Sequence, residues 1–253
     1  MKIFFIGAGN AAKIIVKEMG ENIDVAYVFD KDMNNASEME RNFKDVKAVE
    51  SRSFKNLEVD YVIECASVEA VKEFGFEVLQ ANKDFIILST GSFADDRFRE
   101  DFLGELSRSK SRVHIPSGAV GGVDIINSIG DKLETIALTT RKPPKSLGID
   151  DKEKETIVFK GSAKEAIKRY PKNINVAVTL SLAARSFDKV SVKIIADPGV
   201  ERNIHEVEIH SKVGRYRIIL ENYPSPNPRT SYLAPLSIVG LLKKMNDKMR
   251  IGV

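Results

Sequence analysis

The chain has 253 residues, of which 43% are hydrophobic, so it is long enough to bury one or two cores in two modest lobes. Its 39 basic and 36 acidic residues leave a net charge of only +3 and are interspersed along the chain, which argues against nucleic acid as a partner. A single cysteine, Cys65, excludes an internal disulfide and a zinc site built on several thiolates. We predict no bound metal.

No stretch approaches 18 consecutive apolar residues, and a strand-like segment begins at the second residue. The sequence therefore predicts neither a membrane span nor a leader, and we expect a cytoplasmic protein. Cys65 lies in an apolar run, so we expect it to be a small core residue.

Strand-like and helical patterns alternate over the first 115 residues. This alternation predicts an α/β fold with a doubly wound parallel sheet, whose strand carboxyl ends line a ligand crevice. Ser67 is expected to cap the third helix. The strands are predicted at 2–6, 24–29, 60–65, 84–89 and 111–115, and the helices near 10–19, 35–43, 67–81 and 95–109.

A glycine turn, Gly7-Ala-Gly9-Asn10-Ala11-Ala12, follows the first strand with the spacing of a dinucleotide-binding turn. Gly7 permits the tight turn, Gly9 lets the backbone approach a pyrophosphate, and the helix that begins at Asn10 and Ala11 presents its amides to the phosphates.

Asp30 closes the second strand about 20 residues after this turn, where a ribose-binding carboxylate is expected. The sequence thus predicts NAD or NADP as cofactor. NAD is favoured because a carboxylate repels a 2′-phosphate, although the neighbouring Lys31 opposes that preference.

After residue 116 the strand-like segments become rich in β-branched residues. They predict an α+β lobe with a mostly antiparallel sheet and helices on one face. The strands are expected at 133–141, 156–160, 189–197, 203–211 and 215–222, and the helices near 122–130, 162–170 and 175–186.

A proline-rich segment then precedes a helical pattern at 230–247, whose apolar face needs a partner. We favour its return to the first lobe; the alternative is a surface helix on the second. The predicted domains are a dinucleotide-binding Rossmann domain of 1–117 and 226–253, and a substrate-binding and dimerisation domain of 118–225.

The loop Ser117-Gly118-Ala119-Val-Gly121-Gly122 exposes backbone amides that suit an anionic ligand, although a tight interdomain connection is the alternative. Strand alternation places His205 on an apolar face and His210 on the opposite face. His205 is either a core histidine or an acid/base group, and Asn203 on the same face favours the polar site.

Two further polar residues have alternative interpretations. Asn175 has the donor and acceptor that a nicotinamide amide needs, but it can equally cap the helix that follows. Lys145 lies in a rigid basic loop and either holds a substrate carboxylate or belongs to a solvated turn.

These motifs together resemble the L-aspartate dehydrogenase family, which is related to the homoserine dehydrogenases in its Rossmann-type fold. The likeness spans nearly the whole chain. The motifs are the Gly7-Ala-Gly9 turn, Glu64-Cys-Ala66, the 116–122 loop, Lys142-Pro-Pro-Lys-Ser-Leu-Gly148, Lys172-Asn-Ile-Asn175, Ala196-Asp-Pro198 and Asn203-Ile-His205.

The resemblance implies NAD(P)-dependent oxidation of L-aspartate to iminoaspartate, which hydrolyses to oxaloacetate and ammonia or supplies NAD biosynthesis. It implies His205 as the catalytic residue, Ala119 and Asn175 as cofactor contacts, and a homodimer formed through the second lobe. We add Ala66 as a cofactor contact. For the substrate carboxylates we assign Ser117, Gly118, Asn203 and Lys145.

Two other functions stay open. The same scaffold can serve another amino-dicarboxylic or homoserine-like substrate, and an NAD-binding redox sensor would keep the glycine turn without needing a proton-transfer histidine.

Overall fold

The structure is a computed structural model that describes residues 1–149, 154–170, 175–225, 231–249 and 251. The chain divides into two units, Met1–Pro116 with Pro235–Asn246, and Ser117–Ala234 with Asp247–Val253. The segment 226–253 is expected to join the first unit, and its helical part Pro235–Asn246 lies there and supplies apolar side chains to the first core.

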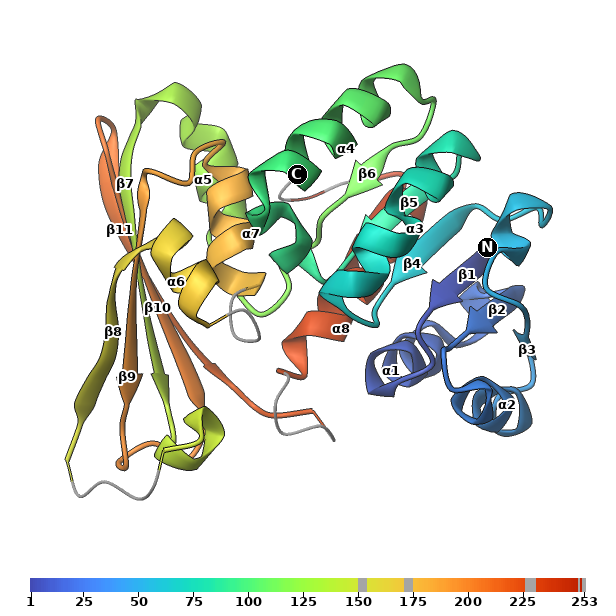
Figure 1. Ribbon diagram of the computed structural model, residues 1–253, viewed down its shortest axis with the longest axis horizontal. Coiled ribbons are helices and arrows are strands. Elements are labelled where there is room, and N and C mark those ends of the chain that lie inside the picture. The colour runs from blue at the N-terminus through green and yellow to red at the C-terminus, as the bar shows by residue number, and fades with distance from the viewer. Residues whose placement is uncertain (150–153, 171–174, 226–230, 250, 252–253) are drawn as a thin grey trace. The chain divides into compact units, whose positions relative to one another are not determined.

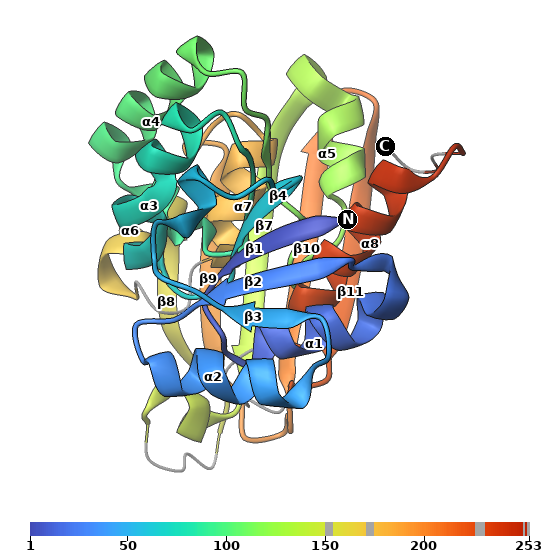
Figure 2. The same cartoon turned by 90° about the vertical axis from the view of Figure 1, so that its right-hand side faces the viewer.

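The first unit is built on sheet A, in which every pairing is parallel. The strand order is β3-β2-β1-β4-β5-β6 (Figure 1), and Figure 2 shows β3, β2, β1 and β4 side by side. The order reverses between β1 and β4, which is where such sheets form a ligand crevice. The three-residue strand β3 was not predicted. The strands are β1 (Lys2–Ile6), β2 (Val25–Phe29), β3 (Val46–Ala48), β4 (Tyr61–Glu64), β5 (Asp84–Ile87) and β6 (Val113–His114).

Helices cover both faces of sheet A. The helices are α1 (Asn10–Met19), α2 (Met33–Asn42), α3 (Val68–Gln80), α4 (Asp96–Arg108) and α8 (Leu233–Asn246). Ile238 and Leu242 of α8 lie in one buried cluster with Ile3 and Ile15, so this helix completes the first core. Ser67 caps α3 by accepting the Ala70 N–H, as predicted.

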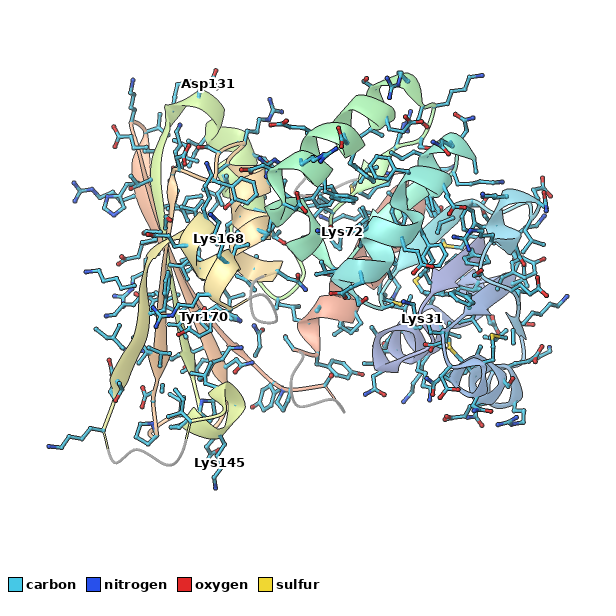
Figure 3. The ribbon with its side chains drawn as sticks, viewed as in Figure 1. Lys31, Lys72, Asp131, Lys145, Lys168 and Tyr170 are labelled. Atoms are coloured by element: carbon cyan, nitrogen blue, oxygen red, sulfur yellow. The ribbon has the colours of Figure 1, made fainter. Side chains whose placement is uncertain are left out.

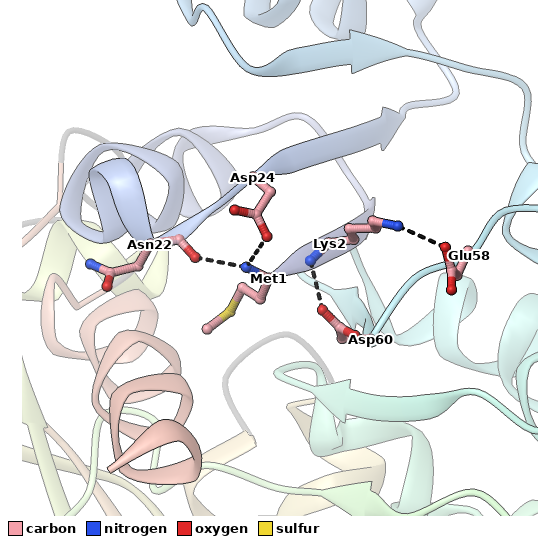
Figure 4. Close-up of polar contacts among 6 residues, drawn as sticks. All are labelled: Met1, Lys2, Asn22, Asp24, Glu58 and Asp60. Atoms are coloured by element: carbon pink, nitrogen blue, oxygen red, sulfur yellow. Dashed lines mark hydrogen bonds and ion pairs between the residues drawn. The ribbon is translucent and has the colours of Figure 1, made fainter.

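Polar contacts fix the start of β1 (Figure 4). The Met1 amine donates to the Asn22 carbonyl at 3.0 Å and to Asp24 Oδ2 at 2.7 Å. The Lys2 N–H donates to Asp60 Oδ2 at 2.7 Å, and Lys2 Nζ donates to Glu58. These bonds tie β1 to the segments that precede β2 and β4. They help to hold the register in which the three strands end together.

The second unit is built on sheet B, with order β11-β10-β7-β9-β8. Three of its pairings are antiparallel, as expected for most of this sheet. β7 and β9 pair in parallel, so the sheet is mixed, because β9 inserts between β7 and β8. The strands are β7 (Leu133–Lys142), β8 (Thr156–Ser162), β9 (Val190–Ala196), β10 (Asn203–Ser211) and β11 (Gly214–Asn222).

One face of sheet B is covered by helices α5 (Val123–Ile129), α6 (Ala163–Arg169) and α7 (Asn175–Ala183), as Figure 1 shows. Their apolar side chains share a core with the inward residues of the strands. We call this covered side the inner face. Among the described helices of the chain, none has the length and apolar character needed to cross a membrane.

Candidate functional site

A cavity of about 270 Å³ lies in the first unit at the carboxyl ends of β1, β2 and β4. Four of the predicted cofactor residues line it together: Gly7, Gly9, Asp30 and Ala66. Two others, Asn10 and Ala11, follow Gly9 as the first residues of α1. The cavity is also lined by Ile6, Phe29, Lys31, Cys65, Ser67, Ala70 and Phe74.

The two glycines of the turn have different physical requirements. Gly7 has a φ of +109°, and a Cβ there would lie 2.9 Å from the Ala66 Cβ, so the fold itself requires glycine. Gly9 has a φ of −77°, and a Cβ there would meet no protein atom within 4 Å. Packing within the unit does not explain Gly9, whereas close approach of a ligand does.

The amino end of α1 suits a phosphate. No side chain caps this helix and its first turn has no acidic residue, so its first amides remain available to an anion. Together with the open side of Gly9, this arrangement fits the pyrophosphate of a dinucleotide.

Asp30 has both a structural and a possible ligand role. Its Oδ2 accepts the Ala8 N–H at 2.8 Å, and its Oδ1 accepts the Asp32 N–H at 3.0 Å and Asn35 Nδ2 at 3.3 Å. Because a carboxylate has about four acceptor positions, it retains capacity for a ribose hydroxyl. The adjacent Lys31 Nζ lies 3.4 Å from Glu73 Oε2.

A buried acid braces one wall of the cavity. Glu64 is 0% exposed and accepts the N–H groups of Ala66 at 2.8 Å and Ser89 at 2.9 Å, together with the Ser89 hydroxyl. Burial raises its pKa to about 7, and bonds from Ser89, Ala66 and Ser67 partly offset this rise. Glu64 thus ties the turn after β4 to the turn after β5.

Cys65 packs against the first core, as expected, and this half-buried residue also lines the cavity. Its Sγ donates to the Gly7 carbonyl at 3.6 Å. Burial is the main cause that raises the pKa of the thiol, which therefore stays protonated near neutral pH.

In the second unit, polar side chains gather at one end of the inner face of sheet B. His205 is 6% exposed, and its Nδ1 lies 3.0 Å from Thr140 Oγ1 on the paired strand. Val207 and Ile209 are buried on the same face of β10, and His210 is exposed, so the predicted alternation is confirmed. The partner of the imidazole is Thr140, whereas sequence reasoning pointed to Asn203.

The strand register arranges this end in two rows. Thr140, His205 and Leu220 form one row across β7, β10 and β11. In the next row Asn203 pairs with Asn222, and because Ile204 pairs with Arg141, Asn203 lies level with Lys142. We call Thr140, Lys142, Asn203, His205 and Asn222 the polar end of sheet B.

The predicted glycine loop is attached to this polar end. Asn222 Nδ2 donates to the Ala119 carbonyl at 2.9 Å. Gly122 has a φ of +84°, and a Cβ there would lie 2.6 Å from the Ile218 Cδ1, so the loop can pack on β11 only with glycine at this position. Ser117 and Gly118 lie in the same loop and are half-buried.

Two basic side chains at the polar end, Lys142 and His205, have lowered pKa values. Lys142 is 7% exposed, and burial lowers its pKa to about 8. Burial, and secondly the charge of Lys142, lower the pKa of His205 to about 4. The imidazole is therefore neutral near pH 7 and can accept a proton.

Lys145 is not among the buried residues of the polar end. It lies in a short turn of helix, η5 (Pro144–Leu147), where it is exposed and points away from the ribbon (Figure 3). Asn175 is the first residue of α7 and is exposed.

Sequence reasoning missed both Thr140 and Lys142. Alternation along β7 from Ile136 and Leu138 places them on the inner face, and this signal was present in the sequence.

Comparisons with known proteins cover both units. Residues 6–116 match the NAD-binding domain of homoserine dehydrogenase, and residues 124–245 match the C-terminal domain of aspartate dehydrogenase. An L-aspartate dehydrogenase of Thermotoga sp. (strain RQ2) is 45% identical over 100% of both chains. That of Methanothermobacter thermautotrophicus is 38% identical over 100% of this chain and 98% of its own.

A solved structure extends the likeness to three dimensions. The crystal structure of aspartate dehydrogenase from Thermotoga maritima superposes with a TM-score of 0.85 at 38% identity, covering 99% of each chain. The amine dehydrogenase of Mycobacterium smegmatis has a TM-score of 0.59 at 8% identity, which shows a shared fold alone. The first unit is thus a pyridine-nucleotide-binding domain of an oxidoreductase, and the chain belongs to the L-aspartate dehydrogenase family.

Proposed function

We propose that this protein oxidises L-aspartate to iminoaspartate with NAD(P), and that the imine then hydrolyses to oxaloacetate and ammonia. The observation that supports this most is the buried His205 held by Thr140 at the polar end of sheet B, in a chain whose other unit has a dinucleotide cavity. Membership of the family supplies the substrate class.

The first unit binds the coenzyme in this proposal. Gly9 and the first amides of α1, at Asn10 and Ala11, hold the pyrophosphate, and Asp30 accepts a hydroxyl of the ribose. Ala66 lies on the cavity wall that Glu64 braces. We assign Ala119 and Asn175 to the coenzyme as the family resemblance implies. The bound nucleotide supplies the hydride acceptor.

The second unit binds the amino acid and moves its proton. In the tautomer whose Nδ1–H donates to Thr140 Oγ1, His205 Nε2 has a lone pair and takes a proton from the substrate ammonium. The resulting neutral amine donates electrons as hydride leaves Cα. His205 Nε2 releases this proton to solvent and, in the hydrolysis that follows, takes a proton from the attacking water. Ser117, Gly118 and Asn203 donate hydrogen bonds to carboxylate oxygen.

We further propose that NAD is preferred over NADP, because Asp30 lines the cavity and would repel a 2′-phosphate. The Lys31 ammonium is drawn toward Glu73, which weakens its opposition to this preference. A homodimer formed through the second unit is proposed from the family resemblance. Sedimentation at several concentrations tests it, with a monomer at all of them as the contrary result.

A substrate screen tests the proposed reaction. Formation of reduced nicotinamide is followed with L-aspartate, L-glutamate and L-homoserine, each with NAD and NADP. We expect the highest kcat/KM for L-aspartate with NAD. Faster turnover of another amino acid would indicate a different substrate on the same scaffold. Tight coenzyme binding without turnover of any of them would instead favour a redox sensor.

A further inference from the structure

Lys142 occupies a position that suits a ligand-binding cation. It is the last residue of β7, on the same inner face as Thr140, and it lies level with Asn203 of the neighbouring strand. The row that contains Thr140 and His205 lies two residues from the Lys142 row along β7, so the two rows are about 7 Å apart. A small ligand that reaches both rows can contact the imidazole at one end and the ammonium at the other.

Burial makes the ammonium of Lys142 a strong site for an anion. The residue is 7% exposed, so its charge has lost most of its hydration. Its field acts on His205, since the charge of Lys142 contributes to lowering the pKa of that imidazole. An anion placed between the rows would interact favourably with the Lys142 ammonium at low local dielectric and would favour the protonated form of His205.

Two charged residues near Lys142, Arg141 and Asp197, bind each other. Asp197, which follows β9, binds Arg141 Nη1 at 3.0 Å through Oδ2 and accepts the Gly199 N–H at 2.8 Å through Oδ1. Arg141 also pairs with Glu155. These contacts form an ion-pair cluster of Arg141, Asp197 and Glu155 at the end of β7.

We propose that Lys142 binds the side-chain carboxylate of the amino-dicarboxylate substrate and so selects it over neutral amino acids. This inference rests on the proposed function, because His205 is taken to act on the α-amine. The α-carbon then lies near the His205 row, and the distal carboxylate extends to the Lys142 row. Ser117 and Asn203 are then assigned to the α-carboxylate.

Direct binding of a dicarboxylate tests the site without turnover. Succinate and butyrate have the same carbon chain and differ by one carboxylate, and calorimetry gives the Kd of each. For wild type we expect tighter binding of succinate, and Lys142→Met should weaken it about 10- to 100-fold while changing butyrate little. Lys160→Met, which removes an exposed cation on β8 of the same sheet, is the matched control and should leave both affinities within threefold.

Two amides of L-aspartate distinguish the carboxylates. L-asparagine lacks the side-chain carboxylate, whereas the α-amide of L-aspartate retains it. Lys142→Met should raise the inhibition constant of the α-amide about 10- to 100-fold and leave that of L-asparagine unchanged. The reverse pattern would assign Lys142 to the α-carboxylate and overturn the proposal, as would a fall in kcat for L-aspartate without a rise in KM.

Wild type provides a test that needs no variant, should Lys142→Met fail to fold. Succinate affinity should fall as pH rises through about 8, where the Lys142 ammonium loses its proton, and His205 should titrate at higher pH with succinate bound. A pH-independent affinity and an unchanged histidine titration would refute the site. If wild type binds succinate through Lys142 but does not oxidise L-aspartate, the proposed function fails and the anion site stands.

Discussion

Both sheets have buried ionisable side chains at one end, Glu64 in sheet A and Lys142 with His205 in sheet B, but the surroundings of these side chains differ. Glu64, at the end of β4, accepts hydrogen bonds from backbone N–H groups and from a serine hydroxyl of its own unit. Lys142 and His205, at the polar end of sheet B, are basic groups whose pKa values burial lowers. One site stabilises loops, and the other is better suited to an external anion.

The comparison shows that burial alone does not identify a ligand site. Glu64 is the more deeply buried group, and its pKa is raised to about 7, yet its bonds act on the turns that form the cavity wall. At the polar end, by contrast, a histidine, a lysine and two asparagines share one face of the sheet, and one of them, Asn222, binds the glycine loop. Removing each group should therefore produce a different defect.

The largest effect is expected for His205→Ala. Loss of a positioned acid/base group should lower kcat for L-aspartate about 10²- to 10⁴-fold with little change in the Kd of NAD. His210→Ala is the control, because that ring lies on the opposite, exposed face of β10. His205→Gln preserves side-chain bulk if the alanine variant unfolds. A kcat within about threefold of wild type in both His205 variants would contradict the assignment.

Glu64→Gln should change stability rather than proton transfer. Because the pKa of Glu64 is about 7 in the folded state and 4.5 unfolded, the folded protein binds the extra proton between these values. Its contribution is present below pH 4.5 and is lost as pH rises through 7, by about 3 kcal/mol in total.

The free energy of unfolding of Glu64→Gln should lack this component of the pH dependence. Urea titrations between pH 4 and 8 measure it, with the exposed Glu40→Gln as the control. Identical pH slopes for wild type and Glu64→Gln would contradict the raised pKa.

The sequence predicted the elements that have strong local patterns. The glycine turn, the parallel strands of the first unit and the alternation of His205 with His210 follow from steric and periodic rules that act over a few residues. The strand β3 was missed because three residues contain little periodicity.

The groups around His205 depend on strand pairing, which brings β7 beside β10 across about 60 residues of chain. Thr140 and Lys142 were missed because no local pattern predicts which strands will be neighbours. Lys145 was predicted to bind the substrate because the sequence does not show where this residue lies relative to the buried face of the sheet.

Asp30 combines the loop-stabilising role of Glu64 with the ligand-binding role proposed for the polar end, because it stabilises the glycine turn and also lines the cavity. Asp30→Ala should lower the ratio of kcat/KM for NAD over NADP about tenfold, as the ribose acceptor and the repulsion of a 2′-phosphate are both lost. The exposed Asp45→Ala is the control. An unchanged ratio would remove Asp30 from the ribose site and leave it a purely structural role like that of Glu64.

The smallest effect concerns the electrostatic coupling within the polar end. Burial is the larger cause of the lowered His205 pKa and the charge of Lys142 the smaller, so Lys142→Met should raise this pKa by less than half of its total depression. The folded His205 titrates below its usual value of 6.5, so its contribution to stability is present above pH 6.5 and is lost as pH falls toward 4. In the variant this loss should end at a higher pH.

Histidine NMR titration measures the shift in the His205 pKa, since the chain has only three histidines and His205→Gln assigns the signal. Lys160→Met, which removes an exposed cation of the same sheet, is the matched control. An unchanged His205 titration in Lys142→Met would show that the two groups are not coupled, and the contrast with the self-contained network of Glu64 would then rest on geometry alone.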